Sequence, residues 1–134
     1  MILSVKTRET TELIDITSDI NRLVQKSGVD QGLCMLYVPH TTAAVTINES
    51  ADSSVKSDML MILNQIIPWE ANYRHLEGNS AAHIKTTLVG SSELIAIENQ
   101  QLVLGTWQGV FFCEFDGPRN RKLQVRILEN KIHE

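Results

Sequence analysis

The chain has 134 residues, of which 43% are hydrophobic and 21% charged, and its twelve basic and sixteen acidic residues give a net charge of −4. This length predicts one domain, residues 1–134, that can bury a core without disulfides or a structural metal. A net negative charge and an aromatic content of only 5% argue against nucleic acid as a partner.

The sequence also argues against a membrane partner and an oxidising compartment. We expect no signal peptide, and no apolar run reaches the length of a membrane span. Cys34 and Cys113 lie within apolar runs and do not form a CxxC motif. We therefore expect two reduced core cysteines and a cytoplasmic protein.

The first third of the chain predicts two strands followed by a helix. Residues 2–8 and 13–16 have the apolar and β-branched content of strands. Thr17 suits the N-cap position, apolar residues follow at helical spacing, and Gly28 suits the residue after the helix. These signals predict a helix over residues 18–27.

Two further strands are predicted before the middle of the chain. The continuous apolar run 33–38 is typical of a strand buried on both faces, and Pro39 ends it. Residues 43–47 alternate more cleanly, as a half-buried strand does. Residues of equal parity share a face of an extended segment, so Val45 is expected to face the core together with Ile47. The opposite face is then expected to carry four polar side chains: His40, Thr42, Thr46 and Asn48.

Two helices separated by a polar loop are predicted next. Asp52 or Ser53 caps a segment whose apolar residues form one stripe as far as Ile66, and Pro68 stops it. Residues 70–79 are polar and predict a loop. Asn79 can cap a third short helix that ends at Gly90.

The last third of the chain predicts four strands in two hairpins. Residues 94–97 and 102–106 flank the turn candidate Asn99-Gln100, and residues 110–115 and 123–128 flank Asp116-Gly117-Pro118. The total is about eight strands and two to three short helices without regular βαβ alternation. We therefore predict an α+β fold, a mostly antiparallel β-sandwich or open barrel.

Three histidines lie beside polar residues at the ends of predicted elements: His40, His75 and His83. Their spacing matches no compact metal motif such as HExxH or a Cys/His finger. The residues alone leave two interpretations open. The histidines are hydrogen-bonding residues in surface loops, or they converge on an ion such as zinc, with Glu49 as ligand or general base. His133, near the C-terminus, is expected to be exposed.

Two carboxylates and two arginines surround the predicted turn at residues 116–118. Glu114 and Asp116 share one strand face, so a cation, an arginine or a shared proton is expected beside them. Arg119 and Arg121 follow the turn and can fold back as those partners, or hold a phosphate bidentately. A charged hairpin tip with weak surface ion pairs is the other interpretation.

Glycine stands on both sides of the segment Thr106-Trp107-Gln108. Glycine inside a strand often marks a bulge or a close backbone approach. The segment is not a phosphate loop, because no helix follows it. The free amides at the start of the predicted third helix, with Lys85 just inside it, are a separate candidate for anion binding.

Together these segments resemble the YjbQ-like family, also called the secondary thiamine-phosphate synthase family, over nearly the whole chain and in the same order. The segments that carry the resemblance are His40–Glu49, Tyr73–His75, Asn79–Lys85, Gly90-Ser-Ser, Gly105–Gln108 and Glu114–Arg119. The resemblance implies an antiparallel β-sandwich and a homotrimer. It also implies a weak transferase activity that joins a pyrimidine diphosphate to a thiazole phosphate and releases pyrophosphate.

The resemblance further implies that the three histidines share one site. We expect His40, His75 and His83 to bind a divalent metal, zinc or magnesium, or to polarise a phosphate. The expected catalytic residues are Asn48, Glu49, His83 and Gln108, and the expected phosphate-binding residues are Lys85, Glu114 and Arg119. The loop Leu76-Glu-Gly-Asn-Ser80 departs from the acidic loop expected in the family, which puts magnesium binding there in doubt.

These residues support two hypotheses about function. The first is an enzyme that acts on a small phosphorylated molecule, with thiamine phosphate formation as the candidate reaction. The alternative is a non-enzymatic trimeric module that binds a metal or a small anion, because the sequence has no recognisable catalytic motif.

Overall fold

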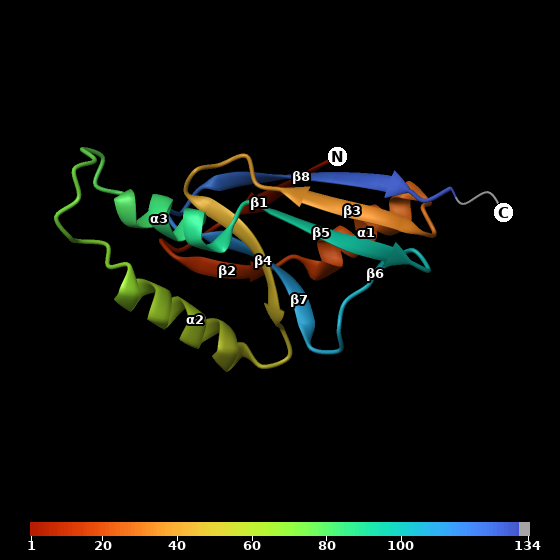
Figure 1. The fold of residues 1–134 in the computed structure, drawn as a ribbon, viewed down its shortest axis with the longest axis horizontal. Coiled ribbons are helices and arrows are strands. Elements are labelled where there is room, and N and C mark those ends of the chain that lie inside the picture. Colours follow the sequence, from red (N-terminus) through yellow and green to blue (C-terminus); the bar gives the residue numbers. More distant parts are fainter. Residues whose placement is uncertain (132–134) are drawn as a thin grey trace.

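The computed structural model describes residues 1–131, so His133 lies outside the described residues. Within them, eight strands form a five-stranded sheet, β1-β8-β3-β5-β6, and a three-stranded sheet, β2-β7-β4 (Figure 1). The strands are β1 (Ile2–Lys6), β2 (Glu12–Asp15), β3 (Gly32–Tyr37), β4 (Ala43–Glu49), β5 (Ser92–Glu98), β6 (Gln101–Leu102), β7 (Gln108–Glu114) and β8 (Asn120–Glu129). Every pairing is antiparallel, which confirms the predicted α+β fold.

Three helices complete the described chain: α1 (Thr17–Ser27), α2 (Ser53–Ile66) and α3 (Ser80–Val89). Helix α1 packs against β6, β7 and β8, and its buried residues Ile20 and Val24 belong to the main core. Helices α2 and α3 lie together at one end of the molecule, beside β2 and β4 (Figure 1). None of these helices is long and apolar enough to cross a membrane.

Two hydrophobic clusters meet on β7. The main core contains Val110 and Phe112 of β7, together with residues of β3, β5, β8 and α1. The second cluster contains Phe111 and Cys113 of β7, and Met59, Leu60 and Leu63 of α2 pack against it. Consecutive residues of β7 therefore face opposite cores, as the period-two geometry of a strand requires.

The face of β4 that we expected to be polar is partly buried. Val45 lies in the main core as predicted, with Ile47 packed against it. Ala44, which shares the parity of Thr42 and Thr46, lies in the second cluster, because α3 packs against β4. Helix α3 thus covers what the sequence alone presented as a polar strand face.

The helix caps differ in detail from the prediction. Ile16, not Thr17, occupies the N-cap of α1, because the Asp15 carboxylate accepts hydrogen bonds from the amide and hydroxyl of Thr17 at 2.9 and 2.6 Å. Asp52 caps α2 as predicted and accepts the amide of Ser54 at 2.9 Å. Asn79 occupies the N-cap of α3, but its side chain makes no capping hydrogen bond.

The second hairpin strand is much shorter than predicted. Asn99 and Gln100 form the expected turn with φ of 52° and 61°, but β6 covers only Gln101–Leu102 instead of residues 102–106. The residues that follow carry the chain from the five-stranded sheet to the start of β7 in the other sheet. A chain that changes sheets at this point cannot continue its ladder with β5.

Candidate functional site

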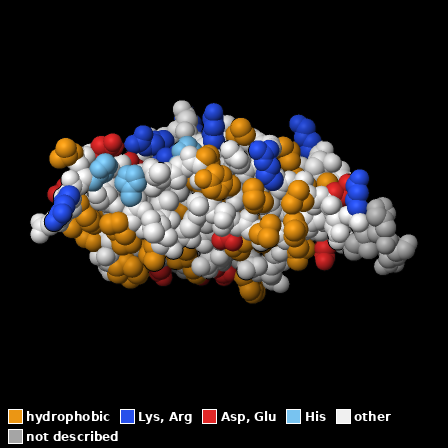
Figure 2. All heavy atoms as spheres, turned by 45° about the horizontal axis from the view of Figure 1, so that its top comes forward, with side chains coloured by type: hydrophobic (Ala, Val, Ile, Leu, Met, Phe, Trp, Pro, Cys, Tyr) orange, Lys and Arg blue, Asp and Glu red, His pale blue; other side chains and the backbone are white. Residues whose placement is uncertain are grey.

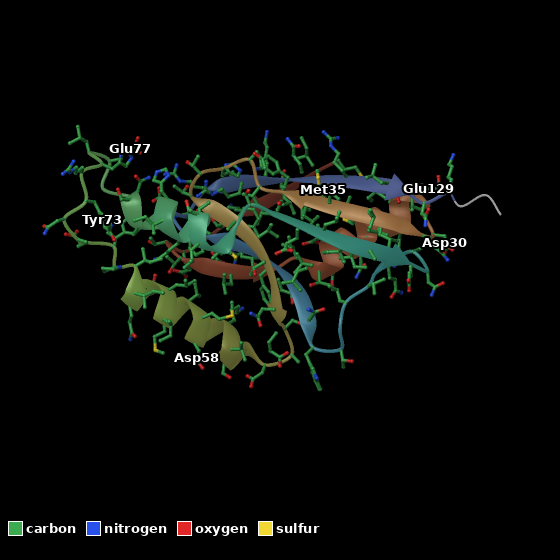
Figure 3. The ribbon with its side chains drawn as sticks, viewed as in Figure 1. Asp30, Met35, Asp58, Tyr73, Glu77 and Glu129 are labelled. Carbon is green, nitrogen blue, oxygen red and sulfur yellow. The ribbon has the colours of Figure 1, made fainter. Side chains whose placement is uncertain are left out.

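A cavity of about 670 Å³ opens where the start of β4, the loop before α3 and the β7–β8 turn meet. It is lined by Tyr37, Pro39, His40, Thr41, Thr42, His75, Glu77, Asn79, His83, Asp116, Arg119 and Arg121. Figure 2 shows the histidines grouped toward the α3 end of the molecule, next to basic and acidic side chains. Glu77 lies in the loop before α3, above Tyr73 in the view of Figure 3. The cavity is therefore polar and carries charges of both signs.

The antiparallel pairing of β4 with β7 creates this meeting point. Ala43 pairs with Glu114, so the segment that carries His40 lies beside the end of β7 and the turn that follows it. Helix α3 follows with His83 in its first turn. Three segments that are far apart in the sequence thus converge at one end of the smaller sheet.

His40 accepts a backbone hydrogen bond that fixes the tautomer of its neutral ring. Its Nε2 accepts the backbone N–H of Lys122 at 3.0 Å, so the neutral ring carries its hydrogen on Nδ1. Burial, and then the charge of Arg121, lower the pKa of His40 below its ordinary value. A metal bound at Nδ1 would require the hydrogen on Nε2, where it would face the Lys122 N–H. The structure therefore does not support His40 as a metal ligand.

His75 and His83 form a pair. Their ring centroids lie 5.4 Å apart and the ring planes meet at 86°, an edge-to-face arrangement. Within residues 1–131, no three His, Cys, Asp or Glu side chains are grouped so that they could hold a metal ion. His40, His75 and His83 all line the cavity, and a metal-binding role for them stays a prediction.

Arg121, which lines the cavity, forms a buried ion pair with Glu114. The Arg121 and Glu114 side chains are 5% and 0% exposed, and Arg121 also donates to the Thr42 hydroxyl at 2.8 Å. The Thr7 hydroxyl donates to Glu114 Oε1 at 2.7 Å. Burial raises the pKa of Glu114, but the hydrogen bonds from Arg121, Thr7 and the Asp116 amide outweigh it, so the pKa is lowered. Glu114 is therefore the counterion of Arg121, which corrects its expected role as a phosphate-binding residue.

Arg119 is the accessible cation of the site. Its Nε donates to the Asp116 carbonyl oxygen at 2.7 Å, and its Nη2 lies 3.1 Å from Asp116 Oδ2. Its side chain is 53% exposed, and an ion pair of this kind is worth little in water. Arg119 thus pairs with Asp116 and Arg121 with Glu114, as one interpretation of the sequence predicted. Of these two arginines, only the exposed Arg119 can rotate toward a ligand.

Lys85 does not face the cavity, which corrects its expected phosphate-binding role. It is 1% exposed, its Nζ donates to Asn64 Oδ1 of α2 at 2.6 Å, and it lies 5.9 Å from the centre of the Phe115 ring. Residues two apart on a helix point about 200° apart, so Lys85 and His83 cannot share a face. Burial lowers the pKa of Lys85.

Three expected catalytic residues lie at the other end of the smaller sheet. Glu49 pairs with Gln108, and Asn48 pairs with Gly109. Six residues of extended chain separate Ala43 from Glu49, which is about 20 Å. Within one chain, Asn48, Glu49 and Gln108 therefore do not reach the histidines, because the antiparallel register puts them beside the exposed Trp107 instead.

Sequence reasoning missed two residues that organise the site. Thr7 joins the Glu114–Arg121 pair from the far end of the sequence, and nothing near it signals this. The Asn79 Nδ2 donates to Asp116 Oδ2 at 2.9 Å and so connects the start of α3 with the β7–β8 turn. The sequence predicted Asn79 as a helix cap and placed it in a segment of the family resemblance, but did not connect it with Asp116.

Comparison with known proteins now identifies the family. A family model described as UPF0047 protein YjbQ-like matches residues 1–130. The chain belongs to this family. UPF0047 protein YugU of Bacillus subtilis is 48% identical to this YjbQ-like chain over 127 residues, which covers 94% of the chain and 96% of YugU. A UPF0047 protein of Methanocaldococcus jannaschii is 52% identical over 127 residues, covering 95% and 92% of the two chains.

Solved structures of the family share the YjbQ-like fold. A YjbQ/UPF0047 protein of Clostridium acetobutylicum matches with a TM-score of 0.93 and 50% identity, over 96% of this chain and 99% of that one. A protein of Sulfolobus solfataricus described as YbjQ-like matches with a TM-score of 0.92 and 33% identity, over 97% and 96%. The fold and the family expected from the sequence are thus confirmed.

Proposed function

We propose that this YjbQ-like chain is a small enzyme that acts on a phosphorylated molecule and binds its phosphate in the histidine cavity. The observation that carries the proposal is one cavity of about 670 Å³ that holds three histidines and an exposed arginine. Such a concave site with convergent polar groups and a group of shifted pKa is the usual setting of catalysis.

Each cationic or donor group has a role in this proposal. A reaction in which phosphate or pyrophosphate leaves needs its growing negative charge neutralised more than it needs a strong nucleophile. Arg119 turns from Asp116 to the phosphate, and the Nδ1–H of His40 donates to a phosphate oxygen. His83 acts as general acid toward the leaving oxygen, with His75 edge-on to its ring.

The reaction that we propose to test first is the one that the family resemblance implies, in which a pyrimidine diphosphate and a thiazole phosphate are joined and pyrophosphate is released. Two carboxylates, Glu77 and Asp116, line the cavity, and Asp116 accepts the hydrogen bonds from Asn79 and Arg119 on Oδ2 only. Magnesium is usually held by one or two carboxylates together with substrate phosphates, so these two residues would hold a magnesium ion that enters with a diphosphate. Such an ion would neutralise charge on the leaving pyrophosphate, and every other role is assigned to the chain's own side chains.

The decisive assay measures pyrophosphate release and thiamine phosphate formation by the purified protein. We expect His83→Ala to lower kcat/KM about a hundredfold, the usual contribution of a general acid. Arg119→Ala is compared with Arg22→Ala, because Arg22 also pairs with an aspartate three residues earlier, at 3.0 Å on the surface of α1. Only the Arg119 variant should lose activity.

The same variants are tested in a thiamine-requiring strain that lacks its main synthase. Rescue by the parent and failure of the His83→Ala variant would support the reaction. Failure of the parent in both assays rejects thiamine phosphate formation. Stoichiometric phosphate or zinc binding without turnover would favour the binding-module alternative, and elemental analysis with calorimetry distinguishes the two ions.

We also propose that the chain assembles as a homotrimer in the cytoplasm. Helix α2 has no buried residue, and Met61, Ile62 and Ile66 are 50%, 46% and 62% exposed, so a second copy is a natural cover for this face. Glu49 would reach the cavity only from such a neighbour. The buried free thiols of Cys34 and Cys113 suit a reducing compartment. Light scattering that finds only 15.1 kDa particles at micromolar concentration would refute the trimer.

A further inference from the structure

We propose that the outer face of the five-stranded sheet is a surface on which two copies of the chain pack face to face about a two-fold axis. The outer face is the side of β1, β8, β3 and β5 that points away from the main core. This contact is additional to the proposed trimer contact through α2, and it does not depend on the proposed activity.

Apolar side chains gather on the outer face. Cys34 and Leu36 of β3 lie in the main core, whereas the alternate residues Leu33 and Tyr37 point outward and are each 42% exposed. Neighbouring strands extend this apolar surface, whose members are Leu33, Met35, Tyr37, Leu94, Ala96 and Leu128. Met35 lies on the side of the sheet that faces away from α2 (Figure 3). Contiguous exposed apolar patches mark interaction sites, so this face has the character of an interface.

The sequence pattern of β3 also indicates that this face is covered. The continuous apolar run 33–38 predicts a strand buried on both faces, but within residues 1–131 only the inner face is covered. A strand that faces water on one side ordinarily alternates apolar and polar residues. A second copy on the outer face gives β3 the other covered side that its composition predicts.

The strand register arranges the outer side chains in rows that cross β8, β3 and β5. The rows are Leu128-Leu33-Ala96, then Arg126-Met35-Leu94, then Gln124-Tyr37-Ser92. Lys122 begins the next row, because it lies two residues before Gln124 on the same face of β8. The apolar surface therefore lies between Lys122 at one end of the sheet and the row of Leu128 at the other.

The two ends of the outer face carry opposite charges. Lys6 and Lys122 are exposed at one end, and neither forms a salt bridge among the residues that the structure describes. At the other end, a hollow of about 500 Å³ has the row of Leu128 in its wall together with Glu98 and Glu129. On this side of the molecule, Figure 2 shows hydrophobic side chains next to Lys and Arg side chains.

The opposite charges select one way of packing two sheets. Sheets that pack face to face keep their strand directions within about 30° of each other. A two-fold axis across the strands reverses their direction and places the Lys122 end of each copy over the acidic end of the other. An axis along the strands would instead bring like charges together, which is unfavourable. The antiparallel arrangement is therefore the one that the charges favour.

The rows also match in this arrangement. If the axis passes between the rows of Met35 and Tyr37, each of these rows covers the other in the second copy, and Lys122 lies over the row of Leu128. Arg126 then lies over the row of Gln124 and not over the second Arg126. A lysine suits the hollow because its methylene groups can lie on apolar side chains while its ammonium group reaches Glu98 and Glu129. A two-fold contact makes each of these interactions twice.

The first test measures particle mass by light scattering at micromolar concentration, with a matched pair of variants. Leu94 on the outer face and Ile66 on α2 are each 62% exposed, so an aspartate at either position should leave the fold intact, as circular dichroism checks. We expect the parent to form particles of two chains if this contact acts alone, and of six if the proposed trimer also forms. Leu94→Asp should halve the particle mass, whereas Ile66→Asp should leave particles of two chains.

The second test reverses the charges at the two ends. Lys122→Glu should raise the concentration at which half of the two-fold contacts dissociate by about tenfold, because it puts like charges opposite each other. The double variant Lys122→Glu/Glu129→Lys should restore association, since each reversed charge then meets an opposite charge in the second copy. Lys26→Glu, at an exposed position in the last turn of α1, is the control and should leave association unchanged.

The outcomes separate this inference from the proposed trimer and from the proposed activity. A parent of one or three chains, a mass that Leu94→Asp leaves unchanged, or no recovery in the double charge variant overturns the two-fold contact. Binding to phosphatidylserine vesicles that Lys122→Glu abolishes, without any change in mass, would assign the face to an anionic surface and also overturn it. A parent of two chains rejects the trimer and supports this contact, and the pyrophosphate assay judges the activity independently of every mass.

Discussion

Replacing Glu114 by glutamine would leave the Arg121 guanidinium buried without its counterion. The two side chains are 0% and 5% exposed, and Glu114 also accepts hydrogen bonds from Thr7 and the Asp116 amide. Removing one partner of a buried ion pair costs about 3–5 kcal/mol. A domain of this size is typically stable by about 5–15 kcal/mol, so the Glu114→Gln variant should lose a large part of its free energy of unfolding.

Urea unfolding followed by circular dichroism measures this loss. The surface variant Glu129→Gln, whose carboxylate is 52% exposed and lies 4.0 Å from Lys131, is the control and should change stability by less than about 1 kcal/mol. The double variant Glu114→Gln/Arg121→Met should be more stable than Glu114→Gln alone, because it removes the orphaned charge. A loss below about 1 kcal/mol in Glu114→Gln, or no recovery in the double variant, would refute the reasoning.

The Glu114–Arg121 pair should also make the free energy of unfolding depend on pH. The folded pKa of Glu114 is lowered, so its contribution is present above its unfolded pKa, about 4.3, and is lost as the pH falls through its folded pKa. The parent should therefore lose more free energy of unfolding than Glu114→Gln between about pH 5 and pH 2. Parallel pH profiles for the two proteins would contradict this assignment.

Three further predictions follow from the described contacts. Lys85→Met should raise the free energy of unfolding by about 1 kcal/mol at pH 7 and leave phosphate affinity unchanged. The lowered pKa of Lys85 makes the unfolded state bind more protons. The parent should therefore gain stability as the pH rises toward the unfolded pKa of about 10.4, and Lys85→Met should lack that gain in urea titrations at each pH. Gly32→Ala should cost about 1–3 kcal/mol, since a Cβ there would lie 2.0 Å from the Leu128 carbonyl oxygen, whereas Gly105→Ala meets only the Gln108 side chain at 3.3 Å and should cost less. His40 should titrate below its ordinary pKa in an NMR titration, because burial and the charge of Arg121 disfavour its protonated form, and a normal or raised value would contradict this assignment.

Local sequence signals predicted the elements well because those elements obey local rules. The apolar spacing and the cap at Asp52 placed α2 within a residue of its observed span, Ser53–Ile66. The alternation after Gly109 correctly put Phe111 and Cys113 on one side of β7. The short β6 was missed because the place where a chain leaves one sheet for another depends on tertiary packing, which has no period in the sequence.

The candidate site was only partly predictable because strand pairing decides which residues meet. The family resemblance brought His75 and His83 together correctly, but it also placed Glu49 with them. The register that pairs Ala43 with Glu114 puts Glu49 at the opposite end of the sheet. Lys85 is different, since its two-residue offset from His83 already argued against a shared helix face. Elementary helix geometry would have corrected that assignment.

Strand β7 of this chain leaves little room for substitution. All six residues from Val110 to Phe115 are at most 4% exposed. Val110 and Phe112 lie in the main core, whereas Phe111, Cys113 and Phe115 lie in the second cluster. Glu114 forms the buried ion pair with Arg121. A substitution in this segment must therefore fit the packing of the main core, the packing of the second cluster or the ion pair with Arg121. Changes at adjacent positions cannot compensate for one another, because neighbouring side chains point into different surroundings. Helix α2, whose residues all retain some exposure, can diverge without that constraint and can adapt its surface to a new neighbour.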